Sequence, residues 1–245
     1  MNIIRPYKKG ICCFPDADQK YKEVSEKASK KQYFLKRIFD MALSFSGIMF
    51  LSPFFLIVAL AIMIEDGLPV FYVQKRLGKD FKEFDLIKFR SMIKHAEKKS
   101  GAVLASENDD RITKTGKLCR KTALDELPQL FNILKGDISV VGPRPERPEL
   151  VEKIIHDNPD FIYRNAVKPG LTGMAQVYGN YDTDDKRKLK YDLFYINNLS
   201  FWLDVKLVIK SFIMTIKGNW SNRGKRKRLL RQTVRRMYLK KVNML

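Results

Sequence analysis

The sequence predicts an α+β protein that is predominantly helical and attached to a membrane. The first observation is an apolar run over residues 41–64, which holds 24 residues without a charge. The second is an amphipathic helix over residues 127–134, whose apolar side chains recur at intervals of three and four. The third is a pair of short segments, residues 70–74 and 83–89, which are rich in aromatic and branched side chains and typical of a small β-hairpin.

Positive charge is concentrated at the two ends of the 245-residue chain. The formal net charge is +20, from 47 Lys and Arg against 27 Asp and Glu. Residues 1–37 hold ten basic and four acidic side chains, and residues 218–245 hold ten basic and no acidic ones. Such an excess calls for a polyanionic partner, which is nucleic acid, an anionic membrane surface or a phosphorylated substrate. No nucleic-acid recognition motif accompanies the charge, so nucleic acid is the least favoured of the three.

The apolar run is long enough for a membrane helix, since about 1.5 Å per residue gives a length of about 36 Å against a hydrocarbon core of about 30 Å. Ser52 and Pro53 lie near its centre. Basic residues flank it on both sides, namely Lys30, Lys31, Lys36 and Arg37 before it and Lys75, Arg76, Lys79 and Lys82 after it. Because positive charge marks the cytoplasmic side, a re-entrant helix that breaks at Pro53 is favoured over a spanning helix, although spanning helices also tolerate proline. Ser52 either donates to a backbone group that Pro53 frees or is a small packing residue.

Two neighbouring acids, Asp125 and Glu126, begin the most regular amphipathic helix. Pro128 fits a first helical turn, where amide hydrogens have no intrahelical acceptor, and Gly136 is typical of the position after a helix end. The start of a helix is the positive end of its dipole, which stabilises anions and keeps carboxylates ionised. The pair could therefore act as nucleophile and metal ligand toward a phosphate, while the simpler interpretation is an N-cap with an acidic first turn.

Basic residues and a glycine loop surround this helix. A basic helix predicted over residues 113–122 brings Arg120 close to the acids, and a strand over residues 138–141 leads to Arg144 between two prolines. A guanidinium presented from such a stiff turn suits phosphate recognition, although an ordinary surface arginine is the alternative. The glycine-punctuated loop over residues 168–173 could bring backbone amides close to an anion.

A second amphipathic helix is predicted over residues 200–218. It has an N-cap serine, a terminal glycine and a wide apolar sector, and its four charged residues make it too polar to span a bilayer easily. Phe201 and Trp202 near its start favour a helix that lies in the membrane interface, and a core helix is an equal alternative. The basic tail over residues 221–245 would be attracted to anionic lipid.

Six motifs occur in the order found in a known family. They are KRIFD from Lys36, Ser-Pro at Ser52, KFRSM from Lys88, LDELPQLFNILKGDISVVGPRPE from Leu124, PGLTGMAQV from Pro169 and Tyr-Asp at Tyr191. Over residues 33–218 the chain therefore resembles the bacterial sugar transferases, which are monotopic polyprenol-phosphate phosphoglycosyl transferases. The central block of 23 residues is too long and specific to agree by chance.

The resemblance implies a re-entrant membrane helix, an enzymatic activity and a subcellular location. Such enzymes transfer a sugar 1-phosphate from a nucleotide sugar, usually a UDP-sugar, to polyprenol phosphate and release UMP, which is the first membrane step of surface polysaccharide or glycoconjugate synthesis. They act at the cytoplasmic face of the bacterial inner membrane, whose anionic lipid would attract the basic ends of this chain. The predicted organisation is a polar arm (residues 1–35), a re-entrant hairpin (36–66), an interfacial cytosolic catalytic domain (67–220) and a basic tail (221–245). Homo-oligomer formation is left open.

By matching motifs, the resemblance also assigns roles to individual residues. Asp125 would attack the sugar-linked phosphate and carry a covalent phosphosugar, and Glu126 would help to hold Mg²⁺. The candidates for phosphate binding share a positive charge and are Lys88, Arg120 and Arg144. Asp192 is a further member of the implied site. Phosphoryl transfer needs an in-line nucleophile, a divalent cation and fixed cationic groups, so the chemistry agrees with these roles.

The chain departs from the family at two places. It has Tyr-Gly-Asn at residues 178–180, where Asn-Gly-Arg is common, and Lys168 where Arg is frequent. One cationic contact to phosphate is therefore weakened or relocated. A rival interpretation is a membrane-anchored glycosyltransferase of the direct-transfer kind that binds metal through Asp182 and Asp184. This DxD pattern is a weak signal, because it spans three residues and no Rossmann-like series of strands precedes it.

Overall fold

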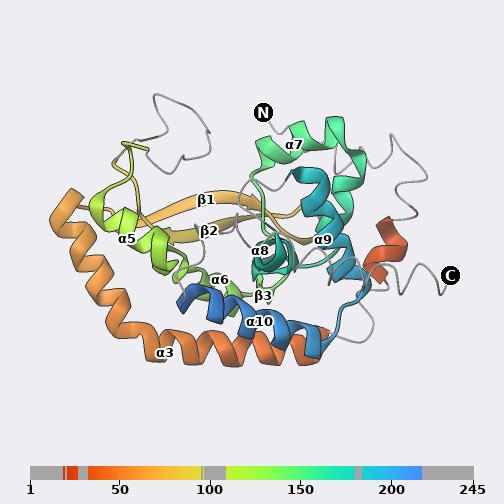
Figure 1. The fold of residues 1–245 in the computed structure, drawn as a ribbon, viewed down its shortest axis with the longest axis horizontal. Helices are drawn as coiled ribbons and strands as arrows, with labels where there is room; N and C mark the ends of the chain where they lie inside the picture. The colour runs from red at the N-terminus through yellow and green to blue at the C-terminus, as the bar shows by residue number, and fades with distance from the viewer. Residues whose placement is uncertain are drawn as a thin grey trace.

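The structure, a computed structural model, describes residues 19, 21–26, 33–94, 96, 109–179 and 184–216. The elements in chain order are α3 (Tyr33–Asp66), β1 (Phe71–Leu77), η2 (Lys79–Phe81), β2 (Glu83–Phe89), α5 (Lys114–Thr122), η3 (Leu124–Glu126), α6 (Gln129–Lys135), β3 (Ser139–Val141), α7 (Pro148–Asp157), η4 (Pro159–Ala166), β4 (Gly170–Thr172), α8 (Met174–Tyr178), α9 (Asp185–Asn197) and α10 (Phe201–Ile216). Figure 1 shows the long helix α3 running along two sides of the other elements. The predicted α+β class with a predominance of helix is confirmed.

Helix α3 contains the apolar run and is continuous across Pro53, where the sequence predicts a break. Figure 1 shows that the helix bends between its two halves. Proline has no amide hydrogen for the carbonyl four residues earlier, which is that of Met49. The hydroxyl of Ser52 donates to this same carbonyl oxygen at 2.9 Å. The Met49 carbonyl therefore has a hydrogen-bond donor although Pro53 cannot supply one.

The outer surface of α3 is apolar and exposed. The helix is long and apolar enough to cross a membrane, and 11% of its most apolar stretch is buried against the protein. A core helix of a soluble domain would be mostly buried. Phe50 is 72% exposed and Ile64 is 86% exposed. The protein therefore presents a continuous apolar helix face that suits a bilayer.

The inner side of α3 is held at both ends by the same domain. Near its beginning, the buried carboxylate of Asp40 accepts a hydrogen bond from the amide of Val140 in β3 at 2.9 Å. At its end, Arg90 donates to the carbonyl oxygens of Asp66 and Gly67, at 3.0 and 2.6 Å. The apolar stretch between these contacts therefore starts and finishes on one domain.

The predicted β-hairpin is present. Strands β1 and β2 pair antiparallel, with Phe71 opposite Phe89 and Tyr72 opposite Lys88. The rings of Phe71 and Phe89 stack with their centroids 5.4 Å apart. Buried Phe89 also packs on the second half of α3 through Phe55, at a centroid distance of 5.5 Å. The hairpin thereby fixes Lys88, one residue earlier, close to the membrane helix.

The glycine loop predicted over residues 168–173 forms a strand. Its residues Gly170–Thr172 are β4, which pairs parallel with β3. A Cβ on Gly170 would lie 2.0 Å from the amide nitrogen of Gly142, so only glycine allows this approach. The amide of Gly170 donates to the carbonyl of Pro143 at 2.8 Å and is not available to an anion. Strands of three residues carry too little pattern to be predicted.

Helix α10 combines the two alternatives that the sequence left open. Leu207 and Asp204 are buried against the domain, whereas Trp202 is 77% exposed. Figure 1 shows α10 lying along the first half of α3, and the rings of Phe39 and Phe201 meet edge-on at 5.3 Å. The exposed side of α10 therefore extends the apolar surface of α3. The basic tail over residues 221–245 lies outside the described residues.

Residues 21–26 are helical and contact the domain, although the sequence predicts a loosely ordered or peripheral arm there. Tyr21 is buried, and its hydroxyl reaches two acceptors, the carbonyl of Asn165 at 3.0 Å and Oδ1 of Asp80 at 3.1 Å. Its ring lies 6.0 Å from that of Phe81. The rest of the arm, apart from residues 19 and 33–35, lies outside the described residues.

Candidate active site

Asp125 and Glu126 lie in a short 3-10 turn between two helices. Helix α5 ends at Thr122, Ala123 adopts a left-handed conformation with φ of 58°, and the turn η3 follows directly. Helix α6 begins only at Gln129. The sequence predicts a helix that begins near Asp125; the structure has a 3-10 turn there, after the reversal at Ala123, and the α-helix follows a few residues later. The acids consequently lie at a junction between α5 and α6.

Glu126 is the centre of an ion-pair cluster. Its Oε1 accepts from the ammonium of Lys88 at 3.2 Å and from Nη2 of Arg144 at 2.5 Å, and its Oε2 accepts from Nη1 of Arg144 at 3.4 Å. Lys88 comes from strand β2, and Arg144 comes from the loop after β3. Three segments far apart in the sequence therefore converge on one carboxylate.

Asp125 is placed differently from its neighbour. Among the described residues, no hydrogen bond or ion pair reaches its carboxylate. Burial and the negative charge of Glu126 raise the pKa of Asp125 to about 6, against the attraction of Lys88, Arg120 and Arg144. The carboxylate is thus mainly ionised at neutral pH but remains unpaired, which is the state that a nucleophile requires.

Ion pairing and burial shift the pKa values of the three groups next to Asp125. Burial alone would raise the pKa of Glu126, but Arg144 and Lys88 outweigh it and hold that pKa well below its usual range. The charge of Glu126 raises the pKa of Arg144, and burial lowers the pKa of Lys88. The cluster therefore keeps Glu126 permanently ionised while Asp125 can gain a proton in mildly acidic solution.

Arg120 reaches the same region from helix α5. Its Nε donates to the hydroxyl of Ser91 at 2.9 Å, and its positive charge lowers the pKa of Asp125. Helix α5 packs very closely on Ser91, since a Cβ on Gly116 would lie 2.0 Å from the carbonyl oxygen of Ser91. The structure thus places the three cations predicted from the sequence around the acidic pair.

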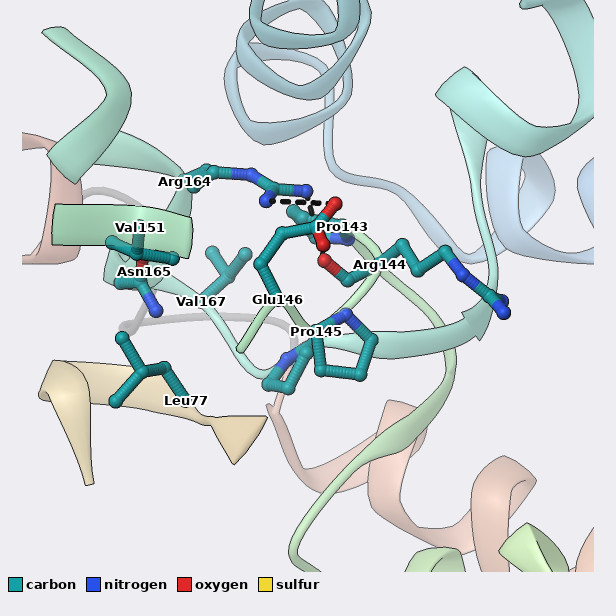
Figure 2. A pocket seen from close by; sticks show the side chains of 10 residues that line it. Leu77, Pro143, Arg144, Pro145, Glu146, Val151, Arg164, Asn165 and Val167 are labelled. Carbon is teal, nitrogen blue, oxygen red and sulfur yellow. Dashed lines mark hydrogen bonds and ion pairs between the residues drawn. The ribbon is translucent and has the colours of Figure 1, made fainter. Parts of the chain in front are cut away.

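Arg144 is supported from behind by the buried Arg164 and the partly buried Arg76. Arg164 donates to the backbone carbonyl of Arg144 at 2.9 Å, and Arg76 donates to that of Pro145 at 3.0 Å. Figure 2 shows the open pocket that this loop lines together with Arg164, and the side chain of Arg144 points away from it. The pocket therefore lies behind the loop, and the guanidinium of Arg144 projects toward Glu126 on the other side.

Asp192 joins the site only indirectly. It is 1% exposed and forms an ion pair with Arg164 at 2.9 Å, and its Oδ1 is buried without a partner among the described residues. Burial raises the pKa of Asp192 to about 6 against the attraction of Arg164. The link from Asp192 to the acidic pair therefore runs through Arg164 and the backbone of Arg144. Sequence reasoning missed Arg164, because nothing in its local pattern distinguishes it from a surface arginine.

The two neighbouring carboxylates are the groups of the site that could hold a divalent cation. No cluster of three or more metal-ligating side chains occurs in the described part of the chain. Mg²⁺ is commonly bound by one or two carboxylates together with substrate phosphates, and Glu126 beside Asp125 offers that donor set. The rival DxD pair falls at the limit of the structure, since Asp182 lies outside the described residues while Asp184 precedes α9.

The fold and the site combine a long, exposed apolar helix with an acidic pair surrounded by Lys88, Arg120 and Arg144. The chain belongs to the bacterial sugar transferase family, whose family model matches residues 31–218. This match covers the membrane helix, both sheets and the complete site described above.

Several curated relatives are similar over the same region. One is the UDP-N-acetylgalactosamine-undecaprenyl-phosphate N-acetylgalactosaminephosphotransferase of Aeromonas hydrophila, with 43% identity over 188 residues, which are 76% of this chain and 44% of the relative. Another is the UDP-glucose:undecaprenyl-phosphate glucose-1-phosphate transferase of Klebsiella pneumoniae, with 40% identity over 75% of this chain and 40% of the relative. The exopolysaccharide production protein PSS of Rhizobium leguminosarum bv. phaseoli is 37% identical over 73% of this chain and 94% of its own length. The chain thus spans less than half of the first two relatives.

Proposed function

We propose that this protein transfers a sugar 1-phosphate from a UDP-sugar to polyprenol phosphate and releases UMP, as the first membrane step of a surface polysaccharide or glycoconjugate. The names of the relatives from Aeromonas and Klebsiella combine a UDP-sugar with undecaprenyl phosphate. The observation that carries the proposal is the contrast between the two acids. Glu126 is paired with Lys88 and Arg144, whereas Asp125 beside it is left unpaired and mainly ionised.

The reaction is proposed to proceed in two displacements. A carboxylate oxygen of Asp125 attacks the sugar-linked phosphorus of the donor, and the bond to the bridging oxygen breaks, so that UMP leaves with that oxygen. A phosphate oxygen of polyprenol phosphate then attacks the same phosphorus. The bond to Asp125 breaks, which restores the carboxylate and leaves a polyprenol diphosphate sugar. Two steps at one carboxylate allow a soluble donor to leave before a membrane-bound acceptor arrives.

The cations around the acidic pair are proposed to act in both displacement steps. Lys88, Arg120 and Arg144 hold and neutralise the phosphate oxygens, whose charge spreads in the transition state. Glu126 keeps Lys88 and Arg144 aligned in the free protein and would help to hold Mg²⁺. When bound, the metal would supply charge neutralisation for the phosphate groups. Arg164 and Arg76 fix the loop that presents Arg144.

The membrane arrangement is part of the proposal. Helix α3 enters the cytoplasmic leaflet of the bacterial inner membrane, bends near Pro53 and returns to the same face. This placement is supported by the contacts of Asp40 and Asp66, at opposite ends of α3, with a single domain. The exposed side of α10 and the basic ends of the chain would lie on anionic lipid. The acidic pair would then lie near headgroup depth, where the acceptor phosphate is found.

The decisive experiment follows UMP and the covalent state of the protein together. Purified protein in nanodiscs would be mixed with Mg²⁺, polyprenol phosphate and a panel of nucleotide sugars, and released UMP would be measured. Mass spectrometry of protein incubated with donor alone should show one added sugar phosphate on the peptide that contains Asp125. UMP release without this adduct would exclude the two-step route, and a nucleoside diphosphate product would favour direct transfer at a DxD site.

A further inference from the structure

The end of the membrane helix is attached to the beginning of helix α5. The carboxylate of Glu65, in the last turn of α3, accepts hydrogen bonds from the backbone amides of Lys114 at 2.6 Å and Thr115 at 2.8 Å. The first amides of a helix have no intrahelical acceptor, and an anion there is stabilised by the helix dipole. Thr113 caps the same helix with its own side chain, which accepts from Gly116 at 2.9 Å. Glu65 therefore accepts hydrogen bonds from the two backbone amides, those of Lys114 and Thr115, that the side chain of Thr113 does not bind.

The other end of α5 leads directly into the site. The helix has nine residues, and its last turn carries Arg120. Ala123 follows in its left-handed conformation, and Asp125 and Glu126 come immediately after it. The close packing of Gly116 on Ser91 holds the middle of α5 against the segment after β2. A displacement of the beginning of α5 would therefore be transmitted to Arg120 and to the acidic pair.

The first half of α3 holds the helix on the opposite side of the acidic pair. Arg37 donates to the carbonyl oxygens of Ile133 and Leu134 in the last turn of α6, at 2.6 Å each. The segment from α5 through the acids to α6 is thus held at its two outer ends by the two ends of α3. Figure 1 shows α5 and α6 lying inside the bend of α3. Neither Arg37 nor Glu65 has a described contact with the acids themselves.

We infer that Glu65 is a positioning residue that sets where the acidic pair sits relative to the membrane helix, and hence relative to the lipid acceptor. This inference rests on the proposed function. Two of the three cations proposed to hold the donor, Lys88 and Arg144, belong to β2 and to the loop after β3 and have no described contact with Glu65, while Arg120 lies on α5 itself. The acceptor, by contrast, arrives in the bilayer beside α3. Loss of Glu65 therefore impairs acceptor use more than donor use.

The test compares Glu65→Ala with Glu65→Gln and with the control Glu149→Ala. Glu149 is an exposed acid in the first turn of α7, so it matches Glu65 in type but contacts neither α3 nor α5. In nanodiscs, Glu65→Ala should raise the KM for polyprenol phosphate about fivefold or more, because Arg120 and the acidic pair would no longer be held in place beside α3, where the acceptor binds. The donor KM should stay within about twofold of the wild type, and the burst of UMP without acceptor should change by a smaller factor than the KM for polyprenol phosphate. Glu65→Gln should be intermediate, because glutamine keeps one oxygen acceptor but loses the second one and the negative charge.

Hydrogen exchange gives a second measurement that does not depend on turnover. The amides of residues 114–126 should exchange faster in Glu65→Ala than in the wild type, and Glu149→Ala should leave them unchanged. A merely destabilised protein would lose donor and acceptor steps in parallel, and that result, or an unchanged KM for the acceptor, would overturn the inference. If the wild type released no UMP with any donor, the proposed function would fail separately, and unchanged exchange would still reject the role of Glu65.

Discussion

Arg144 meets Glu126 through both of its terminal nitrogens, with Nη2 at 2.5 Å from Oε1 and Nη1 at 3.4 Å from Oε2. This geometry is the bidentate arrangement in which a guanidinium binds a planar carboxylate or a phosphate. In the free protein Glu126 thus occupies the position that a donor phosphate would take on Arg144. Binding of the diphosphate with Mg²⁺ would release Glu126 from Arg144 to become a metal ligand.

Asp125→Asn should lower UMP release by about 1,000-fold or more, because loss of a covalent nucleophile removes the reaction route itself. The variant keeps the size of the side chain but cannot form an acyl phosphate. Steady-state UMP release and the mass of the donor-treated protein would be measured together. Asp157→Asn, at an exposed acid that contacts only His156 among the described residues, is the matched control. Substantial turnover in Asp125→Asn would show that another group attacks the phosphorus.

Glu126→Gln should nearly abolish turnover and should raise the Mg²⁺ concentration needed for half-maximal activity. The neutral amide is a poorer ligand for a hard cation than a carboxylate. It also leaves Arg144 and Lys88 without their counter-charge. A Mg²⁺ titration of UMP release for the two proteins gives the measurement. An unchanged Mg²⁺ requirement with reduced turnover would assign Glu126 to the alignment of Arg144 alone.

The donor step should lose activity as the pH falls through about 6, where Asp125 takes up a proton and can no longer attack. The negative charge of Glu126 contributes to the raised pKa of Asp125. The acidic limb of any residual activity in Glu126→Gln should therefore move to lower pH. The amplitude of the UMP burst would be measured between pH 5 and pH 8 in both proteins. A limb that stays in place in the variant would mean that Asp125 does not control it.

Asp192→Asn should change how stability depends on pH. Burial raises the pKa of Asp192 from its ordinary value of 3.8 to about 6, so the folded protein binds this proton more tightly than the unfolded chain. The corresponding stabilisation, on the order of 3 kcal/mol, is present below the ordinary pKa and is lost as the pH rises through about 6. Asparagine cannot titrate, so the decline of Tm between pH 4 and pH 7 should be smaller in the variant. Asp160→Asn, at an exposed acid, should retain the wild-type slope.

The topology of α3 can be tested by labelling cysteines at its two ends. In a protein without Cys12 and Cys13, the replacements Phe34→Cys and Leu68→Cys should both react with an impermeant reagent from the cytoplasmic side. Phe34 and Leu68 are exposed, at 78% and 64%, and the remaining Cys119 is buried. Pro53→Leu restores an amide that can bond the Met49 carbonyl and should shift part of the population to a spanning helix. Reaction of the second position from the periplasmic side in the parent protein would reject the re-entrant arrangement.

Elements whose pattern lies within a short stretch of sequence could be predicted. The apolar run identified α3, alternation of aromatic and branched residues identified the hairpin, and helical spacing identified α6. The acids and the cations Lys88, Arg120 and Arg144 were found through their motifs, and the structure brings them together.

Features that depend on distant contacts were not predicted. The pairing of β3 with β4 brings Gly142 against Gly170 across 28 positions of sequence, and neither strand is long enough to show a period. Arg164 supports Arg144 through a hydrogen bond from its side chain to the backbone carbonyl of Arg144, and no pattern in the sequence predicts such a bond. Asp192 was predicted within the site, but its ion pair with Arg164 became visible only in three dimensions.

The docking of Tyr21 has a practical consequence for anyone who wishes to shorten this protein. The region shared with the family begins at residue 31, yet the buried phenol of Tyr21 covers Phe81 and reaches the backbone of Asn165. A version trimmed to the shared region would uncover that aromatic surface and remove a donor from a buried carbonyl. Truncations should therefore keep residues 21–26, which lie upstream of the shared region.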